Sequence, residues 1–235
     1  MIRGFYSARS GLIGQQTNMN TIANNFANVS TTGYKPQQAA FSSLLYAKLP
    51  GGAGTAVSTG HGVRAQHTAV NYAQAGFTST GIPTDMAINE EGFFAVSVGE
   101  DGDVFYTRAG EFRYSVDGDS KFLVDPFGGY VLDESGSPVE LEAHEEITPA
   151  RIGVYRFANQ HGLELRGSNR LAATEVSGEP ELVEQPDVRA GYLERSGVDL
   201  STEMVRMIES SRAFGFNSRV IQAIDEMDDT ANQLR

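Results

Sequence analysis

Both ends of this 235-residue chain carry a repeating apolar stripe, and such a stripe requires a partner surface to cover it. Near the N-terminus, Phe5, Leu12, Met19 and Phe26 recur every seven residues. This spacing places the four side chains along one face of a helix, as in the seam of a coiled coil. We therefore expect an amphipathic helix over the first 35 residues, with its exit at Gly33.

A second stripe begins near Leu200 and steps by three and four residues toward the C-terminus. Its members are Leu200, Met204, Met207, Ser211, Phe214, Ser218, Ile221 and Ile224, with Val220, Met227, Ala231 and Leu234 extending the same apolar pattern. Asp199 or Ser201 can cap this helix by accepting a hydrogen bond from the first turn. We expect both terminal helices to fray in a free monomer, because neither stripe has a partner there.

Between the stripes the pattern changes twice. Residues 36–84 are rich in Gly, Ala, Ser, Thr and Gln without a strong period, which predicts an extended connector with short strands near Val57 and Val63. Residues 85–195 show short alternating apolar runs separated by turn residues, the pattern of hairpins in a compact β domain. The expected fold class is α+β: coiled-coil-like helices at 1–35 and 196–235 form a discontinuous helical domain, with a mainly antiparallel β domain inserted.

Composition excludes several kinds of partner. The chain has 18 basic and 30 acidic side chains, a formal net charge of −12, which disfavours binding to nucleic-acid phosphates. It has no cysteine, so disulfides and thiolate metal sites are excluded. The N-terminal residues form a polar-striped helix and no apolar run reaches the roughly 18 residues of a membrane span. We therefore expect no cleaved signal peptide and no membrane insertion.

Chemical motifs are weak. The four histidines, at positions 61, 67, 144 and 161, have no partner at helical ligand spacing. Residues 117–121 resemble a calcium loop, but Lys121 stands where an oxygen ligand is required, which favours a hairpin turn. Residues 60–65 approximate a dinucleotide fingerprint without a surrounding βαβ unit, and adjacent acidic pairs fit a solvated surface. We expect no catalysis, no metal and no cofactor.

Three segments carry motifs that do resemble a known family. The N-terminal segment contains Gln15–Gln16, Met19, Ile22–Val29 (IANNFANV) and Thr32–Lys35 (TGYK). The C-terminal segment contains Gly197–Val205 (GVDLSTEMV), Met207–Ile208, Arg212–Phe214, Asn217–Ser218 and Asp225–Met227. A middle segment contains Asp85–Asn89 (DMAIN), Gly92–Phe94 and Tyr106–Gly110 (YTRAG). Together they resemble the axial proteins of the bacterial flagellum, specifically the rod and hook basal-body group, and residues 1–12 most resemble its distal-rod members.

The resemblance implies a structural subunit of the basal-body rod, which polymerises through its terminal helices into a helical, torque-transmitting shaft. The implied partners are further copies of the chain, neighbouring rod and hook proteins, and the flagellar type III export apparatus. The expected assembly interface comprises Phe5, Leu12, Met19, Ile22, Asn24, Asn25, Phe26, Asn28, Met204, Met207, Phe214, Asn217, Ile221 and Ile224. In this interpretation the Asn amides fix the register between helices of different subunits.

Two alternatives stay open. The connector after Lys35 is short for a distal-rod protein, which favours a proximal-rod or hook-like paralogue. A secreted, β-rich adhesion protein carried on a helical stalk is the alternative from another class. The Asn cluster also has a simpler explanation, because three asparagines can mark nothing more than the frayed end of a helix.

Overall fold

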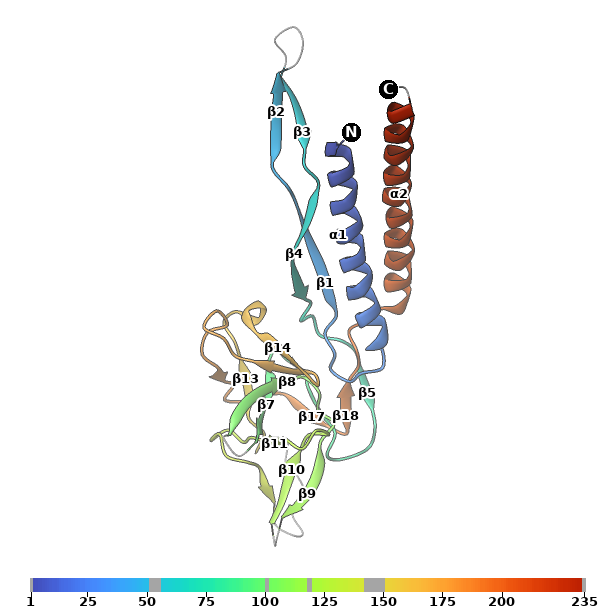
Figure 1. The fold of residues 1–235 in the computed structure, drawn as a ribbon. Coiled ribbons are helices and arrows are strands. Elements are labelled where there is room, and N and C mark those ends of the chain that lie inside the picture. Colours follow the sequence, from blue (N-terminus) through green and yellow to red (C-terminus); the bar gives the residue numbers. More distant parts are fainter. Residues whose placement is uncertain (1, 51–55, 100–101, 118–119, 142–150, 234–235) are drawn as a thin grey trace. The chain divides into compact units, whose positions relative to one another are not determined.

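The computed structural model of the chain describes residues 2–50, 56–99, 102–117, 120–141 and 151–233 (Figure 1). The chain divides into two compact units. Unit 1 consists of residues 1–27, 37–71 and 199–235, and unit 2 consists of residues 28–36 and 72–198. The backbone therefore passes between the units four times. The fold class is α+β with antiparallel strand pairing, as the sequence predicts.

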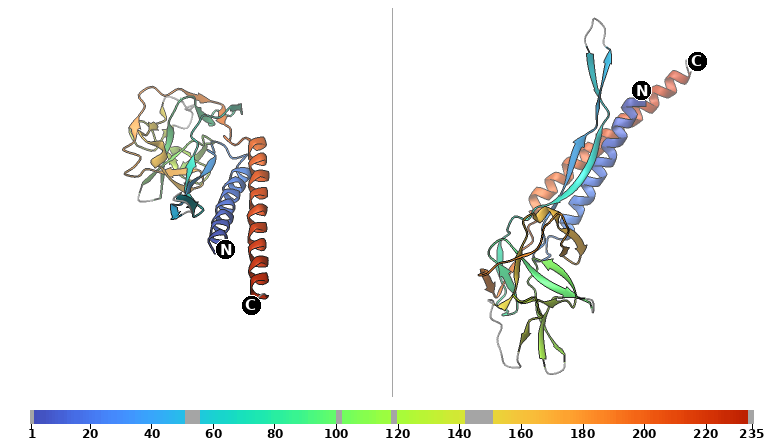
Figure 2. Two further views of the ribbon diagram at one scale, coloured as in Figure 1. Left: turned by 90° about the horizontal axis from the view of Figure 1, so that it is seen from above. Right: turned by 90° about the vertical axis from the view of Figure 1, so that its left-hand side faces the viewer.

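Two long helices are the main elements of unit 1. Helix α1 spans Ile2–Ala27 and helix α2 spans Leu200–Gln233, and they lie side by side and antiparallel (Figures 1 and 2). Asp199 caps α2, since its carboxylate accepts a hydrogen bond from the Ser201 N–H at 3.1 Å. The predicted helix exit at Gly33 is wrong, because α1 ends at Ala27 and a turn follows in which the Thr31 N–H donates to the Asn28 carbonyl.

A long antiparallel hairpin completes unit 1 and replaces the connector expected for residues 36–84. Its strands are β1 (Gln37–Ser43), β2 (Tyr46–Pro50), β3 (Ala56–Gly60) and β4 (Val63–Val70), with β1 paired to β4 and β2 paired to β3. The polar and small residues gave no strand period because a two-stranded ribbon has little buried surface to impose one. The Gly51–Gly54 tract lies outside the described residues.

The hairpin packs on α1 at positions where α1 has no bulky side chain. A Cβ atom on Gly14 would lie 3.4 Å from the Phe41 ring, so the ring rests directly on the helix backbone. The Val63 N–H donates to Ser10 Oγ at 3.2 Å. Glycines that weaken α1 as an isolated helix are thus sites of close approach in the folded unit.

Unit 2 is built from short strands. They are β5 (Phe77–Ser79), β6 (Met86–Ile88), β7 (Phe93–Val98), β8 (Asp103–Thr107), β9 (Arg113–Asp117), β10 (Ser120–Val124), β11 (Tyr130–Val131), β12 (Glu140–Leu141), β13 (Val154–Arg156), β14 (Glu164–Gly167), β15 (Arg170–Ala172), β16 (Glu181–Leu182), β17 (Val188–Ala190) and β18 (Tyr192–Glu194). The main sheet follows the order β12-β10-β11-β7-β8-β15-β14, with β9 on β10 and with β13 on β7 and β16. Two further pairs, β17 with β6 and β18 with β5, complete the unit.

Strand β7 lies at the centre of the hydrophobic core. Phe94 faces one buried cluster, whereas its neighbours Phe93 and Ala95 face another, as expected because successive side chains of a strand point to opposite faces. Gly110 lies between β8 and β9, which do not pair with each other, so it is not the turn of a hairpin. A Cβ atom there would lie 1.6 Å from the Met86 carbonyl oxygen, so this glycine allows the backbone to pass against β6.

Candidate assembly surface

The contact between α1 and α2 is made largely by small and polar residues. Gly4 lies against Ile224, and Gly11 lies so close to Asn217 that an added Cβ atom would be 2.8 Å from its side-chain nitrogen. Ser210 Oγ lies 2.8 Å from Gln15 Oε1 and 3.2 Å from the Gln15 carbonyl oxygen. The absence of side chains on the glycines lets the helices approach closely along this face.

The side of α2 that is buried within the chain is mostly polar. Its buried positions among the described residues are Glu203, Ser210 and Ile224, spaced by seven and fourteen residues, with half-buried Asn217 at the intervening seven-residue step. Glu203 has an exposed fraction of only 3%. One carboxylate oxygen accepts a hydrogen bond from Arg206 at 3.0 Å, and the other, Oε2, has no hydrogen-bond partner in the described part of the chain.

Most of the large apolar side chains of α2 are exposed, although Ile224 is buried and Phe214 and Ile221 are half-buried. Those with more than a third of their surface exposed are Leu200, Met204, Val205, Met207, Ile208, Phe216, Val220 and Met227. A helix on the surface of a globular protein normally buries most of its apolar residues. At about 100° per residue these positions spread over more than half of the helix circumference, and we call the exposed side that they occupy the outer face of α2. Exposed apolar side chains in such number are typical of interaction surfaces.

The predicted interface residues fall into three groups. Ile22, Asn25 and Ile224 are buried in the chain; Phe5, Leu12, Met19, Asn28, Phe214, Asn217 and Ile221 are half-buried; Asn24, Phe26, Met204 and Met207 are exposed. The first group is covered by the chain itself and supports the folded unit. Asn28 lies in unit 2, where its carbonyl accepts a hydrogen bond from Ser196 Oγ at 2.9 Å.

Asn25 has a defined role within unit 1. Its side-chain amide donates to the Gln37 carbonyl at 2.7 Å and accepts from the Gln37 N–H at 2.9 Å. It thereby fastens the end of α1 to the first residue of β1. These bonds pair the amide with backbone groups of its own chain, and the predicted role of the Asn amides between subunits stays a prediction.

Unit 2 contains a buried ionic cluster that the sequence analysis did not single out. Lys35 Nζ lies 2.7 Å from Glu194 Oε1, and Arg108 Nε lies 2.9 Å from Glu194 Oε2. The exposed fractions of the three side chains are 7%, 6% and 1% for Lys35, Arg108 and Glu194. Burial lowers the pKa of Lys35, an effect opposed by the Glu194 carboxylate, and burial likewise lowers the pKa of Arg108.

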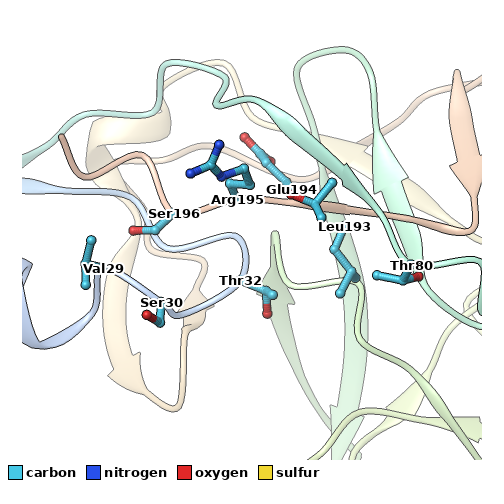
Figure 3. A pocket seen from close by; sticks show the side chains of 9 residues that line it. Val29, Ser30, Thr32, Thr80, Leu193, Glu194, Arg195 and Ser196 are labelled. Carbon is cyan, nitrogen blue, oxygen red and sulfur yellow. The ribbon is translucent and has the colours of Figure 1, made fainter. Parts of the chain in front are cut away.

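The described residues show no arrangement typical of catalysis. An open pocket of about 310 Å3 in unit 2 is lined by Val29, Ser30, Thr32, Thr78, Thr80 and residues 193–196 (Figure 3). Its hydroxyl groups have no histidine among the lining residues to act as a base. No group of three or more potential metal ligands occurs in the described ranges, although His144 falls outside them. None of the described helices is long and apolar enough to cross a lipid bilayer.

Comparison with known families matches three segments of the chain to flagellar rod and hook proteins. Residues 5–35 match the family described as flagella basal body rod protein. Residues 87–154 match the D1 domain of flagellar hook protein FlgE/F/G, and residues 189–234 match the C-terminal region of flagellar basal body rod FlgEFG proteins. The three matches follow one another in the order α1, the β unit and α2.

Relatives that match over their full length are rod proteins rather than hook proteins. The chain is 34% identical to the flagellar basal-body rod protein FlgG of Buchnera aphidicola subsp. Baizongia pistaciae over 97% of both chains. It is 34% identical to FlgG of Borreliella burgdorferi over 100% of this chain and 99% of that one, and 30% identical to FlgG of Bacillus subtilis over 97% of both. The hook protein FlgE of Helicobacter mustelae matches over only 56% of this chain and 30% of its own length.

This chain belongs to the flagellar basal-body rod protein family. The full-length matches to FlgG favour the rod over the hook. The alignments with FlgG cover 254 to 268 positions, more than the 235 residues of this chain, so these relatives contain residues that the present chain lacks.

Proposed function

We propose that this chain is a structural subunit that polymerises through its terminal helices into the helical, torque-transmitting shaft of the flagellar rod. The observation that carries the proposal is the reversed polarity of α2, whose outer face is apolar while its inner face holds Glu203 and Ser210. Such a helix is built to be covered from outside by further protein.

The pairing of α1 with α2 inside one chain is correspondingly weak. A buried carboxylate oxygen without a hydrogen-bond partner, such as Glu203 Oε2, costs about 1–3 kcal/mol. Ser210 and Asn217 contribute hydrogen bonds or close packing rather than apolar burial. The helix pair therefore gains little from its own contact and depends on neighbours for much of its stability.

The outer face of α2 can supply what the internal contact lacks. Burial of the exposed parts of Leu200, Met204, Met207 and Ile208, which are 36–53% exposed, would contribute about 3–5 kcal/mol per subunit, before the entropic cost of association is subtracted. We infer that the occupant of this face is the helical unit of another copy. A patch that meets a different patch on the next copy produces an open helical polymer when the rotation between copies does not close a ring.

The same proposal includes the remaining predicted partners. Neighbouring rod and hook proteins would meet the two ends of the shaft, and the flagellar export apparatus would deliver the chain without a cleaved signal peptide. Unit 2 has its own two-cluster core and would form the outer layer of the shaft. Phe5, Leu12 and Met19 on α1 and Phe214 on α2 remain predicted members of the assembly surface.

The test compares two single aspartates on α2 in a bacterium whose only copy carries the change. Met204→Asp places a charge among the exposed apolar residues at the start of α2, whereas Gln222→Asp places the same charge at an exposed polar position on the same side of the helix, about five turns further along. We expect Met204→Asp to leave the protein made and exported but the rods truncated and the cells non-motile, because a charge without a partner cannot be buried cheaply. Electron microscopy of isolated basal bodies measures rod length directly.

Rods of normal length in both strains would show that the outer face of α2 is not an assembly surface. In that case the adhesion alternative gains, which expects a discrete oligomer and a ligand-dependent surface on residues 85–195. Circular dichroism of the purified variants controls for folding, since neither position belongs to the core of unit 2.

A further inference from the structure

The three segments that join unit 2 to unit 1 are fastened to one another around Glu194. These segments are residues 28–36, residues 72–76 and residues 191–198, and all of them belong to unit 2. Glu194 Oε1 accepts the Lys35 ammonium from the first segment at 2.7 Å and the Ala75 N–H from the second at 2.8 Å. Lys35 also donates to the Ala73 carbonyl at 2.9 Å.

Backbone hydrogen bonds run through the same junction. The Gly33 N–H donates to the Glu194 carbonyl at 2.9 Å, and the Gly197 N–H donates to the Tyr34 carbonyl at 2.9 Å. The Arg195 N–H donates to the Gly76 carbonyl at 2.8 Å. Each segment is therefore bonded to at least one of the others.

Arg108 connects this junction to the β core. Besides its ion pair with Glu194, its guanidinium donates to the Gly92 carbonyl at 2.6 Å and to the Glu90 carbonyl at 2.7 Å, immediately before β7. Gly33 lies directly on the Arg108 backbone, because a Cβ atom at Gly33 would be 2.6 Å from the Arg108 carbonyl carbon. The positive φ of Gly33, +64°, is accessible to glycine without strain.

We propose that Lys35, Glu194 and Arg108 form an ionic lock that holds the three connecting segments as one rigid bundle against the β core. The inference rests on the proposed shaft function, because torque entering unit 2 through any one segment is then shared by all three. Without the lock the segments are held to one another mainly by the backbone hydrogen bonds described above, and segments held by so few bonds open at a lower free-energy cost.

The net charge of the cluster decides which substitution can remove the lock without unfolding unit 2. The lock holds two cations and one anion, so Glu194→Gln leaves two buried cations without a counter-charge and can unfold unit 2 altogether. Lys35→Met leaves the Arg108–Glu194 pair neutral and keeps the length and apolar stem of the lysine. This variant removes only the bonds from Lys35 to Glu194 and Ala73.

The experiment is hydrogen exchange with mass spectrometry on the purified full-length chain. In Lys35→Met we expect amides in all three connecting segments to exchange about tenfold faster or more, while those of β7 keep their protection. Arg113→Met is the matched control, since it removes a cation from an exposed ion pair with Glu111 in the same unit. Exchange that is unchanged, or faster in residues 28–36 alone, would overturn the lock.

Swimming under load tests its mechanical role. Cells carrying Lys35→Met should swim at the parental speed in dilute medium and slow more steeply than Arg113→Met cells as viscosity rises. An identical dependence on viscosity in the two strains would contradict load sharing. Because exchange is measured on the unassembled protein, failure of the lock is distinguishable from failure of the shaft proposal, which the Met204→Asp strain decides.

Discussion

Replacing Asn25 by Ala should detach the hairpin from the end of α1. The substitution removes both hydrogen bonds to the Gln37 backbone, and Asn25 is only 1% exposed, so the Gln37 N–H and carbonyl lose their partners in a buried place. Each buried backbone group left unpaired costs about 1–3 kcal/mol, whereas the better helix propensity of Ala returns about 0.5 kcal/mol. We therefore expect the free energy of unfolding of unit 1 to fall by about 2–5 kcal/mol, with no change in unit 2.

Hydrogen exchange locates this loss, because protection should fall in residues 37–43 and persist in β7 of unit 2. The control is Asn20→Ala, an exposed asparagine of the same helix whose side chain accepts only a surface hydrogen bond from Gln16 at 3.2 Å. Asn25→Asp should fall between the two, since a carboxylate accepts from the Gln37 N–H but cannot donate to its carbonyl. Equal exchange in the Asn25→Ala and Asn20→Ala proteins would refute the reasoning.

Three further outcomes follow from the structure. Burial raises the pKa of Tyr106 to about 12 from 10.0, so the neutral phenol stabilises unit 2 below pH 10. This contribution to the free energy of unfolding, about 2–3 kcal/mol, is lost as the pH approaches 12, and Tyr106→Phe should make the urea midpoint of unfolding depend less on pH between 10 and 12. Gly215→Ala, with nothing within 4 Å of the added Cβ, should stabilise α2 by about 1 kcal/mol in thermal denaturation, whereas Gly11→Ala should lose this gain to its contact with Asn217. Limited digestion of the monomer should spare residues 72–198 and cut the terminal helices first, as mass spectrometry of the fragments will show.

The two helices and the central strands could be predicted from sequence because each has a strong period. The spacing of Phe5, Leu12 and Met19 required a helix, and the alternation through Phe94 and Val96 required a strand. The strands expected near Val57 and Val63 are confirmed as β3 and β4, but their pairing with β2 and β1 into one hairpin could not be predicted, because its polar, partly covered strands show no clear alternation. A periodic pattern of apolar residues arises where one face of a strand is buried, and the strands β1 and β4 have no buried residues.

The ionic lock has no periodic pattern in the sequence, but one of its residues, Lys35, stands out by its charge. Lys35 is the only charged residue between Arg9 and Lys48, and a lone charge in so long a neutral stretch suggests a specific partner. Its partners Arg108 and Glu194 are 73 and 159 residues away, Arg108 within the Tyr106–Gly110 motif and Glu194 three residues before the motif that begins at Gly197. No local pattern can connect residues so far apart, so the contact required the fold.

The apolar stripe of α1 lies next to its contact with α2. On α1 this contact includes Gly4, Gly11 and Gln15, and the predicted stripe begins one residue after the two glycines, at Phe5 and Leu12. One residue is about 100° around a helix, so Phe5 and Leu12 lie beside the internal contact, whereas Ile224 of the α2 stripe packs on Gly4 within it. On α2 the same offset separates exposed Met204 from buried Glu203.

This common offset has a consequence for assembly. The apolar stripes of α1 and α2 flank their shared contact, so a third helix can reach both of them only after the pair has formed. A neighbouring subunit would therefore recognise the paired state and stabilise it, coupling folding of the weak helix pair to growth of the polymer. Subunits would remain separate until a growing end offers such a helix, because two free monomers would each have to order their helices at the moment of contact.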